Sequence, residues 1–298
     1  MTGLESRMAF CSNGAMMNQT PIETALSRAM IRWSLSKTTL VAETPTSLLY
    51  KVEQNGRDTA ALKLLKPESG ADEARGGELL AWYGGEGAVT VFDSIDGAVF
   101  MEWVEGESLA DLSRGGKDRE ATEALADVAG RLHQRRDATP PELATVRERF
   151  SALFASKSLT WPRMGRDLLA RSVGIAHKLF DKPSAHLPLH GDLHHGNILR
   201  AHRGWLAVDP KGLLGDPVYD LAPAFMNPID APKIASNPAR IAHMTEVFSA
   251  RLGHKPKRLL GFAAAHAALS ACWAIEDGET INTQIAVLPH LLAAYDQA

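Results

Sequence analysis

The stretch HGDLHHGNIL, residues 190–199, places three histidines, an aspartate and an asparagine within ten residues. One interpretation is a zinc site, because His190 and His194 are four residues apart and would share one face of a helix. However, Gly191 and Gly196 disfavour a helix here, and no glutamate follows His190. A second interpretation is a polar loop without a chemical role.

A third interpretation uses His190, Asp192 and Asn197, whose spacing H-x-D-x-x-x-x-N is typical of a catalytic loop for phosphoryl transfer. Asp192 can accept a hydrogen bond from an attacking hydroxyl, and the Asn197 side-chain oxygen can bind Mg²⁺. Magnesium prefers oxygen ligands and keeps several waters, so few protein ligands suffice. A second carboxylate is then expected just downstream. Asp209 supplies it directly after the apolar run in GWLAVDPKG, although an ordinary turn residue at a strand end is the alternative.

Phosphoryl transfer also predicts a lysine on a strand, placed to hold phosphate oxygens. Lys63 lies between apolar residues in AALKLL, where the alternative is an edge lysine whose charged end reaches water. Glu73 or Glu78, from the helix that follows, could pair with Lys63, and Glu73 is the preferred partner. Lys211, two residues after Asp209, could also reach a phosphate.

Periodicity divides the chain into a small mixed lobe and a larger helical lobe. Helical spacing over 22–35 precedes a region, 40–104, that predicts a small sheet carrying one helix, with a hairpin turn at Asn55-Gly56. From about residue 109 onward helical patterns dominate. The predicted division is a tail (1–21), an N-lobe (22–105) and a C-lobe (106–298).

Composition argues for a soluble globular protein, with 45% hydrophobic and 22% charged residues and a net charge of −3. A nucleic-acid partner is not expected, because nothing in this charge suggests a surface for a polyanion. Cys11 and Cys272 show no disulfide or zinc-ribbon spacing. The N-terminus makes a poor signal peptide, and the longest apolar stretch, 261–275, is too short and too alanine-rich to span a bilayer. We therefore expect a cytoplasmic protein without membrane contact.

Several stretches resemble the aminoglycoside phosphotransferases, and more narrowly the streptomycin 6-kinase and hydroxyurea kinase branch. The resemblance covers about residues 40–280. It is carried by LHGDLHHGNIL (189–199), RGWLAVDPKGLLGDPVYDLA (203–222), ADEARGGELLAWYGGEGAV (71–89), RERFSALF (147–154), and NPARIAHMTEVFSARL (237–252) followed by ALSACWAIEDGE (268–279). It implies an α+β, bilobal protein-kinase-like fold. A small antiparallel-sheet N-lobe with one helix would face a larger, mainly helical C-lobe, with ATP in the cleft between them.

The resemblance also implies roles for single residues. Asp192 would be the catalytic aspartate, Lys63 would contact the nucleotide phosphates, and Mg²⁺ would be held by Asn197 and Asp209. The segment MEWVEG (101–106) would be the hinge. The remaining implied roles are adenine contacts from the backbone of Glu102 and Val104, and structural roles for Asp216 and Asp220.

Two departures from protein kinases matter. ETPTSLL (43–49) replaces a glycine-rich phosphate loop, so we expect Thr46 and Ser47 to supply hydroxyl and backbone contacts. Pro210 follows the metal aspartate where protein kinases have Phe-Gly, and no activation-loop signature follows. Both departures favour a small-molecule acceptor over a protein.

The stretch WAIEDGET (273–280) gathers Glu276, Asp277 and Glu279 at the expected C-terminal end of a helix, where the helix dipole disfavours negative charge. A carboxylate cluster could receive a cationic acceptor such as the guanidinium groups of streptomycin. The alternative is a solvated Asp-Gly turn.

The sequence thus predicts an ATP- and magnesium-dependent kinase that phosphorylates a hydroxyl of a small, cationic acceptor, an aminoglycoside such as streptomycin, with antibiotic resistance as one role. Two alternatives stay open. One is a metabolic kinase for another hydroxylated amine or sugar, and the other is a non-catalytic nucleotide-binding module on the same fold. The sequence carries no signal for an oligomeric state.

Overall fold

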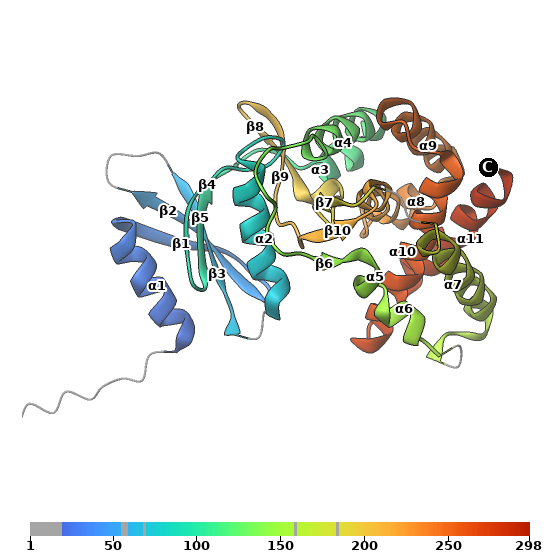
Figure 1. Ribbon diagram of the computed structural model, residues 1–298, viewed down its shortest axis with the longest axis horizontal. Coiled ribbons are helices and arrows are strands. Elements are labelled where there is room, and N and C mark those ends of the chain that lie inside the picture. Colours follow the sequence, from blue (N-terminus) through green and yellow to red (C-terminus); the bar gives the residue numbers. More distant parts are fainter. Residues whose placement is uncertain (1–19, 55–58, 68–69, 158–159, 183–184) are drawn as a thin grey trace, which may run out of the picture.

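The computed structural model describes residues 20–54, 59–67, 70–157, 160–182 and 185–298. These residues form a sheet-based N-lobe and a larger helical C-lobe, shown side by side in Figure 1. The α+β, two-lobed architecture expected from the sequence is confirmed. Residues 1–19 of the predicted tail and the predicted Asn55-Gly56 turn lie outside the described residues.

The N-lobe is built on a five-stranded antiparallel sheet with strand order β1-β2-β3-β5-β4. Its strands are β1 (Leu35–Glu43), β2 (Ser47–Gln54), β3 (Ala60–Leu65), β4 (Val91–Ile95) and β5 (Ala98–Glu102). The sequence did not predict β1. It is an edge strand in which only Leu35 is buried, so it lacks the alternating apolar pattern of a half-buried strand.

Helix α1 (Pro21–Arg32) accompanies the sheet where helical spacing over 22–35 predicted a helix, and α2 (Gly70–Tyr83) is the one helix predicted within the sheet region. Helix α1 begins with a capping box in which the Thr20 hydroxyl accepts from the Glu23 N–H. Helix α1 and the sheet share a small apolar core, in which Trp33 stacks on Phe100 with ring centroids 5.2 Å apart. This core fixes one face of the sheet and leaves the other face for α2 and the C-lobe.

The C-lobe is mainly helical, as predicted. Its helices are α3 (Leu109–Arg114), α4 (Asp118–Leu132), α5 (Val146–Arg149), α6 (Ser151–Ala155), α7 (Arg166–Phe180), α8 (Pro232–Ala235), α9 (Pro238–Leu252), α10 (Pro256–Glu276) and α11 (Asn282–Gln297). Helix α9 ends at Gly253, whose left-handed φ of 72° provides the predicted stop.

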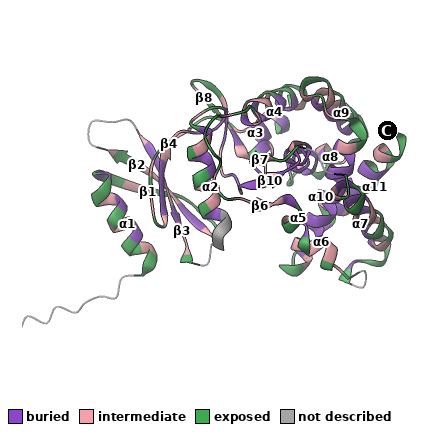
Figure 2. Ribbon diagram, in the orientation of Figure 1, coloured by how far each residue is buried: buried purple, intermediate pink, exposed green. Residues whose placement is uncertain are grey.

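Helix α10 forms the centre of the C-lobe. Its 21 residues make it longer than the predicted apolar stretch, and by length and composition alone it could cross a membrane. The expectation that this segment is too short was therefore wrong. Nevertheless, 78% of its most apolar 18-residue segment is buried inside the protein, among α7, α11 and other C-lobe elements (Figure 2). We therefore describe α10 as a core helix.

Five short strands of the C-lobe hold the polar loops. They are β6 (Ala144–Thr145), β7 (Leu187–Leu189), β8 (Ile198–Ala201), β9 (Gly204–Ala207) and β10 (Leu213–Gly215). Strand β7 ends one residue before His190, β8 begins one residue after Asn197, and β9 ends two residues before Asp209. The Val208 N–H donates to the Asn197 carbonyl at 2.9 Å, so the two polar segments are joined directly.

A close backbone contact joins α2 to the loop that carries Asp209. A Cβ atom placed on Gly76 would lie 2.1 Å from the carbonyl oxygen of Pro210. The glycine that weakens α2 as a helix therefore lets the two lobes approach each other next to the predicted metal aspartate.

We expect Gly76→Ala to lower both stability and turnover, because the added methyl group displaces Pro210 and with it Asp209. The matched control is Gly174→Ala in α7, where a Cβ meets nothing within 4 Å. Higher helix propensity should make this control neutral or more stable by about 0.5–1 kcal/mol. Urea unfolding and steady-state kinetics of both variants provide the measurement, and wild-type values for Gly76→Ala would contradict the role of this contact.

Candidate active site

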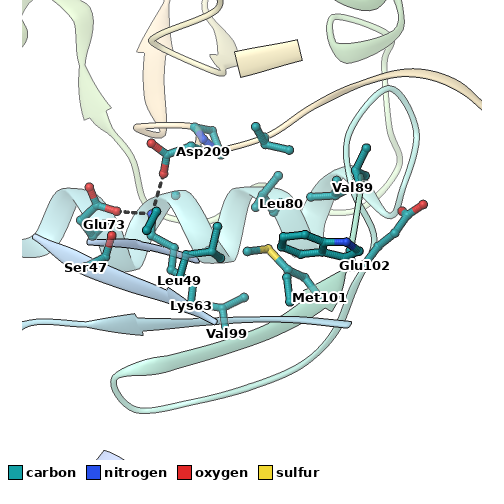
Figure 3. Close-up of a pocket in the computed structure, with 18 of the residues that line it drawn as sticks. Ser47, Leu49, Lys63, Glu73, Leu80, Val89, Val99, Met101, Glu102 and Asp209 are labelled. Atoms are coloured by element: carbon teal, nitrogen blue, oxygen red, sulfur yellow. Dashed lines mark hydrogen bonds and ion pairs between the residues drawn. The ribbon is translucent and has the colours of Figure 1, made fainter. Parts of the chain in front are cut away.

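An elongated cavity of about 1050 Å³, part of it open to solvent, lies beneath the N-lobe sheet and against the C-lobe. Most of its walls are apolar, and they come from both lobes: Leu49, Ala61, Leu80, Val89, Val99, Met101, Val104, Leu199 and Val208. Charged side chains gather at one end, where Lys63, Glu73 and Asp209 meet (Figure 3). An apolar slot with charges at one end suits a nucleotide, with the base in the slot and the phosphates at the charged end.

The predicted hinge residues line the other end of the slot, away from Glu73 and Asp209 (Figure 3). The Glu102 side chain accepts a hydrogen bond from Arg203 at 2.6 Å and another from the Thr90 N–H at 3.0 Å. The backbone N–H of Glu102 is engaged as well, since it donates to the Thr90 carbonyl at 2.8 Å. Adenine contacts from the backbone of Glu102 and Val104 therefore stay a prediction.

Lys63 lies on β3 and faces two carboxylates from different parts of the chain. Its ammonium group pairs with Glu73 on α2 and lies 2.5 Å from Oδ1 of Asp209. Glu73 is buried, with 5% of its side chain exposed, whereas Glu78 is exposed. The preferred partner of Lys63, Glu73 rather than Glu78, is therefore the one that the structure provides.

The two carboxylates are ionised because of their lysine neighbours. Burial by itself would raise the pKa of Glu73. Lys63 and Lys211 together lower that pKa by more than burial raises it, so it lies below its ordinary value. The same competition between burial and the two lysines lowers the pKa of Asp209. This end of the cavity therefore carries two negative and two positive groups at neutral pH.

The segment ETPTSLL forms a tight turn between β1 and β2. The Thr44 N–H donates to the Ser47 carbonyl, and the Ser47 N–H donates to the Thr44 hydroxyl, both at 2.9 Å. Ser47 lines the cavity, and so does Thr44 in the same stretch, which the sequence did not single out. Thr46 is not among the lining residues, and its hydroxyl donates to Glu73 at 3.1 Å instead.

The loop that begins at His190 is fixed by buried contacts. A ring nitrogen of His190 lies 2.9 Å from the Val208 carbonyl, so this histidine braces the loop. The N–H groups of His190 and Gly191 both donate to the buried carboxylate of Asp220, at 3.0 and 2.7 Å. Gly191 has a φ of 81°, and a Cβ there would lie 2.8 Å from Leu213. Asp220 thus has the structural role implied by the resemblance.

Asp192 and Asn197 lie together in this loop. The Asn197 Nδ2 donates to the Asp192 carbonyl at 3.0 Å and lies 3.5 Å from its Oδ2. The amide nitrogen is therefore engaged, and Oδ1 of Asn197 is the atom suited to bind a cation. Burial raises the pKa of Asp192, but His194, 3.7 Å away, and His190 lower it more, to far below its usual range.

The donor set fits magnesium better than zinc. The described residues contain no group of three or more His, Cys, Asp or Glu side chains that could hold a metal alone. Both ring nitrogens of His190 already have partners, the Val208 carbonyl and the Asp192 N–H, which removes a ligand from the zinc interpretation. Oxygen atoms of Asn197 and Asp209 are ligands that Mg²⁺ accepts alongside water and phosphate. Asp209 also has a φ of 56°, a costly value for a residue other than glycine and one that is frequent at functional sites.

A second cavity, of about 550 Å³ including open solvent, is lined by Glu148, Arg149, Trp273 and Leu213, among others. Leu213 packs against Gly191, so this cavity lies next to the loop that carries Asp192. Arg149 covers the Trp273 ring at 4.4 Å. Arg149 and Glu148 belong to the RERFSALF stretch, for which the sequence suggested no role. The only sequence signal that could have drawn attention to them was the resemblance of that stretch.

The predicted acidic cluster lies one turn beyond Trp273. Glu276 ends α10, and Asp277 and Glu279 follow it, with all three exposed to solvent. None of the three lines either of the two cavities described above. A role for this cluster in acceptor binding therefore stays a prediction.

Comparisons with known proteins agree with this geometry. A sequence profile of the aminoglycoside/hydroxyurea antibiotic resistance kinases matches residues 32–278. The chain is 39% identical to streptomycin 3''-kinase from Klebsiella pneumoniae over 84% of its length and 92% of that protein. It is 31% identical to streptomycin 6-kinase from Streptomyces griseus, with coverages of 88% and 86%.

Solved structures share the fold. The aminoglycoside phosphotransferase APH(4)-Ia, as a thermostable mutant in a ternary complex with ADP and hygromycin B, superposes with a TM-score of 0.65. Its sequence identity is 14%, over 91% of this chain and 98% of that one. A choline/ethanolamine kinase family protein from Mesorhizobium loti gives a TM-score of 0.63 at 16% identity, with coverages of 92% and 99%. At these identities the likeness concerns the fold alone.

We predict that Glu73→Gln destabilises the protein by about 1–3 kcal/mol at pH 7, because two lysines lose their shared buried carboxylate. The pKa of Glu73 is lowered in the folded state, so its stabilising contribution exists above the unfolded-state pKa and is lost as pH falls through the folded one. The difference between wild type and variant should therefore shrink below about pH 4.5. Urea unfolding across this range measures it, and a gap that widens on acidification would contradict the assignment.

Proposed function

The chain belongs to the aminoglycoside/hydroxyurea antibiotic resistance kinases, and from this premise we propose that it transfers the γ-phosphate of ATP to a hydroxyl group of streptomycin or a related cationic acceptor. The observation that carries the proposal is the convergence of Lys63 and Asp209 at the charged end of an apolar slot, next to the loop that carries Asp192 and Asn197. The four residue types in this arrangement are those that phosphoryl transfer requires.

ATP is the proposed phosphate donor. The slot between the lobes has the apolar walls that an adenine site requires, and Glu102 and Val104 are among the residues that line it. Lys63 would hold phosphate oxygens at the opposite end. The complex of APH(4)-Ia with ADP supports this choice, since that protein shares the fold.

Asn197 and Asp209 would hold Mg²⁺, with water and phosphate oxygens as the remaining ligands. When bound, the metal would neutralise charge on the phosphates. The strained backbone at Asp209 and the Gly76–Pro210 contact would set the position of its carboxylate before any ligand arrives.

Asp192 would receive the hydrogen bond of the acceptor hydroxyl and orient its oxygen toward the phosphorus atom. The bond from phosphorus to the β-phosphate oxygen of ATP breaks, the bond to the acceptor oxygen forms, and the hydroxyl proton passes to Asp192. Because the pKa of Asp192 is so low, the carboxylate takes this proton only late in the transfer. A loose transition state makes such a weak base sufficient.

Two positions on the acceptor are named by the relatives, the 3''- and the 6-hydroxyl of streptomycin. The higher identity to the 3''-kinase, 39% against 31%, supports phosphorylation at the 3'' position. Product analysis by phosphorus NMR distinguishes the two outcomes. An ADP-release screen with streptomycin, hydroxyurea, choline and ethanolamine then tests the kinase against its rivals, a metabolic kinase and a non-catalytic nucleotide-binding module.

Replacing the catalytic carboxylate tests the mechanism. We expect Asp192→Asn to lower kcat at least about 10²-fold, the typical contribution of a positioned base. ATP affinity, measured by calorimetry, should stay within a factor of about three, because Asp192 is not among the residues that line the nucleotide cavity. Wild-type turnover in Asp192→Asn would overturn the proposed mechanism.

The acidic cluster is proposed to attract the cationic acceptor. The triple variant Glu276→Gln, Asp277→Asn, Glu279→Gln should raise KM for streptomycin several-fold, while kcat and KM for ATP stay constant. Because exposed charges are screened, the effect should weaken as salt is raised from 0.05 to 0.5 M, a range chosen to span Debye lengths of roughly 14 to 4 Å. An unchanged KM for streptomycin at low salt would remove the cluster from the acceptor site.

A further inference from the structure

A second lysine, Lys211, completes a closed ring of charges at the end of the nucleotide cavity. Its Nζ donates to Oε1 of Glu73 at 2.9 Å and lies 3.5 Å from Oδ2 of Asp209. Lys63 contacts the other oxygen of each carboxylate, Oε2 of Glu73 and Oδ1 of Asp209. Each carboxylate therefore sits between two ammonium groups, and each ammonium between two carboxylates.

The two lysines reach this ring from different lobes. Lys63 comes from β3 in the N-lobe sheet, close to the turn that contains Ser47. Lys211 comes from the C-lobe, where its backbone N–H donates to the His190 carbonyl at 2.7 Å. Lys211 is thus attached to the loop that carries Asp192, the residue proposed to meet the acceptor hydroxyl.

We infer that Lys211 is a second catalytic cation, which contacts the phosphoryl group during its transfer; this inference rests on the proposed function. Mg²⁺ held by Asp209 would compete with Lys211 for that carboxylate, one of the two partners of the lysine. Phosphate oxygens are the anions that enter the site at that moment, and a flexible lysine side chain with 20% exposure can turn to them.

The two lysines approach the phosphates from different sides and therefore have different tasks. Lys63 approaches from the sheet and serves the phosphates that stay with ADP, whereas Lys211 stands on the acceptor side, next to the Asp192 loop. The phosphorus atom exchanges its bond to the ADP oxygen for a bond to the acceptor oxygen, and the hydroxyl proton goes to Asp192. Lys211 forms no covalent bond in this step and neutralises charge on the moving group.

The test compares Lys211→Met, Lys211→Arg and a control, Lys37→Met, which removes an exposed lysine paired with Glu53 on the far strands of the sheet. Lys211→Met is expected to lower kcat about 10²–10³-fold, the usual loss for one preorganised charge-stabilising group. KM for ATP should stay within a factor of about three, and Lys211→Arg should recover part of kcat.

Binding provides a readout other than activity. Calorimetry should give equal affinities of wild type and Lys211→Met for the ATP analogue AMP-PNP with Mg²⁺. The affinity for ADP with Mg²⁺, aluminium fluoride and streptomycin, which mimics the phosphoryl group in transfer, should fall by a factor similar to that in kcat. Equal losses for both ligands, or a normal kcat, would overturn the inference and leave Lys211 as a structural partner of Glu73.

If the proposed function is wrong, the experiments give a different result from the one expected if only the role of Lys211 is wrong. In that case wild-type protein would show no ADP release that depends on streptomycin, and Lys211 would be judged by the slow hydrolysis of ATP to water, which needs no acceptor. A Lys211→Met variant that hydrolyses ATP at the wild-type rate would reject the inference in that assay as well. Thermal unfolding of the ligand-free variants identifies any loss of activity that comes from unfolding.

Discussion

The buried carboxylate of Asp220 is the contact on which the site depends most. It accepts N–H groups from His190 and Gly191 and lies 2.9 Å from a ring nitrogen of His133. Without it, two buried N–H groups at the start of the catalytic loop would have no partner, at a cost of about 1–3 kcal/mol each. The conformation of the loop therefore follows from a residue that takes no part in the chemistry and lies about 30 positions later in the chain.

The second constraint joins the lobes. Gly76 allows α2 to touch Pro210, and the α2 carboxylate Glu73 binds both lysines, one from each lobe. On the opposite side of the slot, Arg203 reaches from the β8–β9 turn to the Gly85 carbonyl and to Glu102. These contacts fix the width of the nucleotide slot at both ends. Small changes at Gly76 or Arg203 should thus affect binding and catalysis together.

The parts of the site that the sequence predicted are those encoded within short stretches. Asp192 and Asn197 share one loop, and Asp209 marks the end of an apolar strand, so spacing was enough to predict them as parts of one site. Glu148 and Arg149 could not be found in this way, because only folding brings them next to Leu213 and Trp273. Strand β1 was not predicted either, because its exposed residues show no hydrophobic periodicity. Thr44 was not predicted as a cavity residue because its position depends on the shape of its turn.

The low pKa of Asp192 decides how the remaining residues must divide the work. A carboxylate that stays ionised far below neutral pH is a weak base, so Asp192 orients the hydroxyl and takes its proton only late in the transfer. Charge on the phosphoryl group must then be met by cations that are in place beforehand. Glu73 serves this purpose, because one buried carboxylate holds two lysines in position without occupying the space of the phosphates.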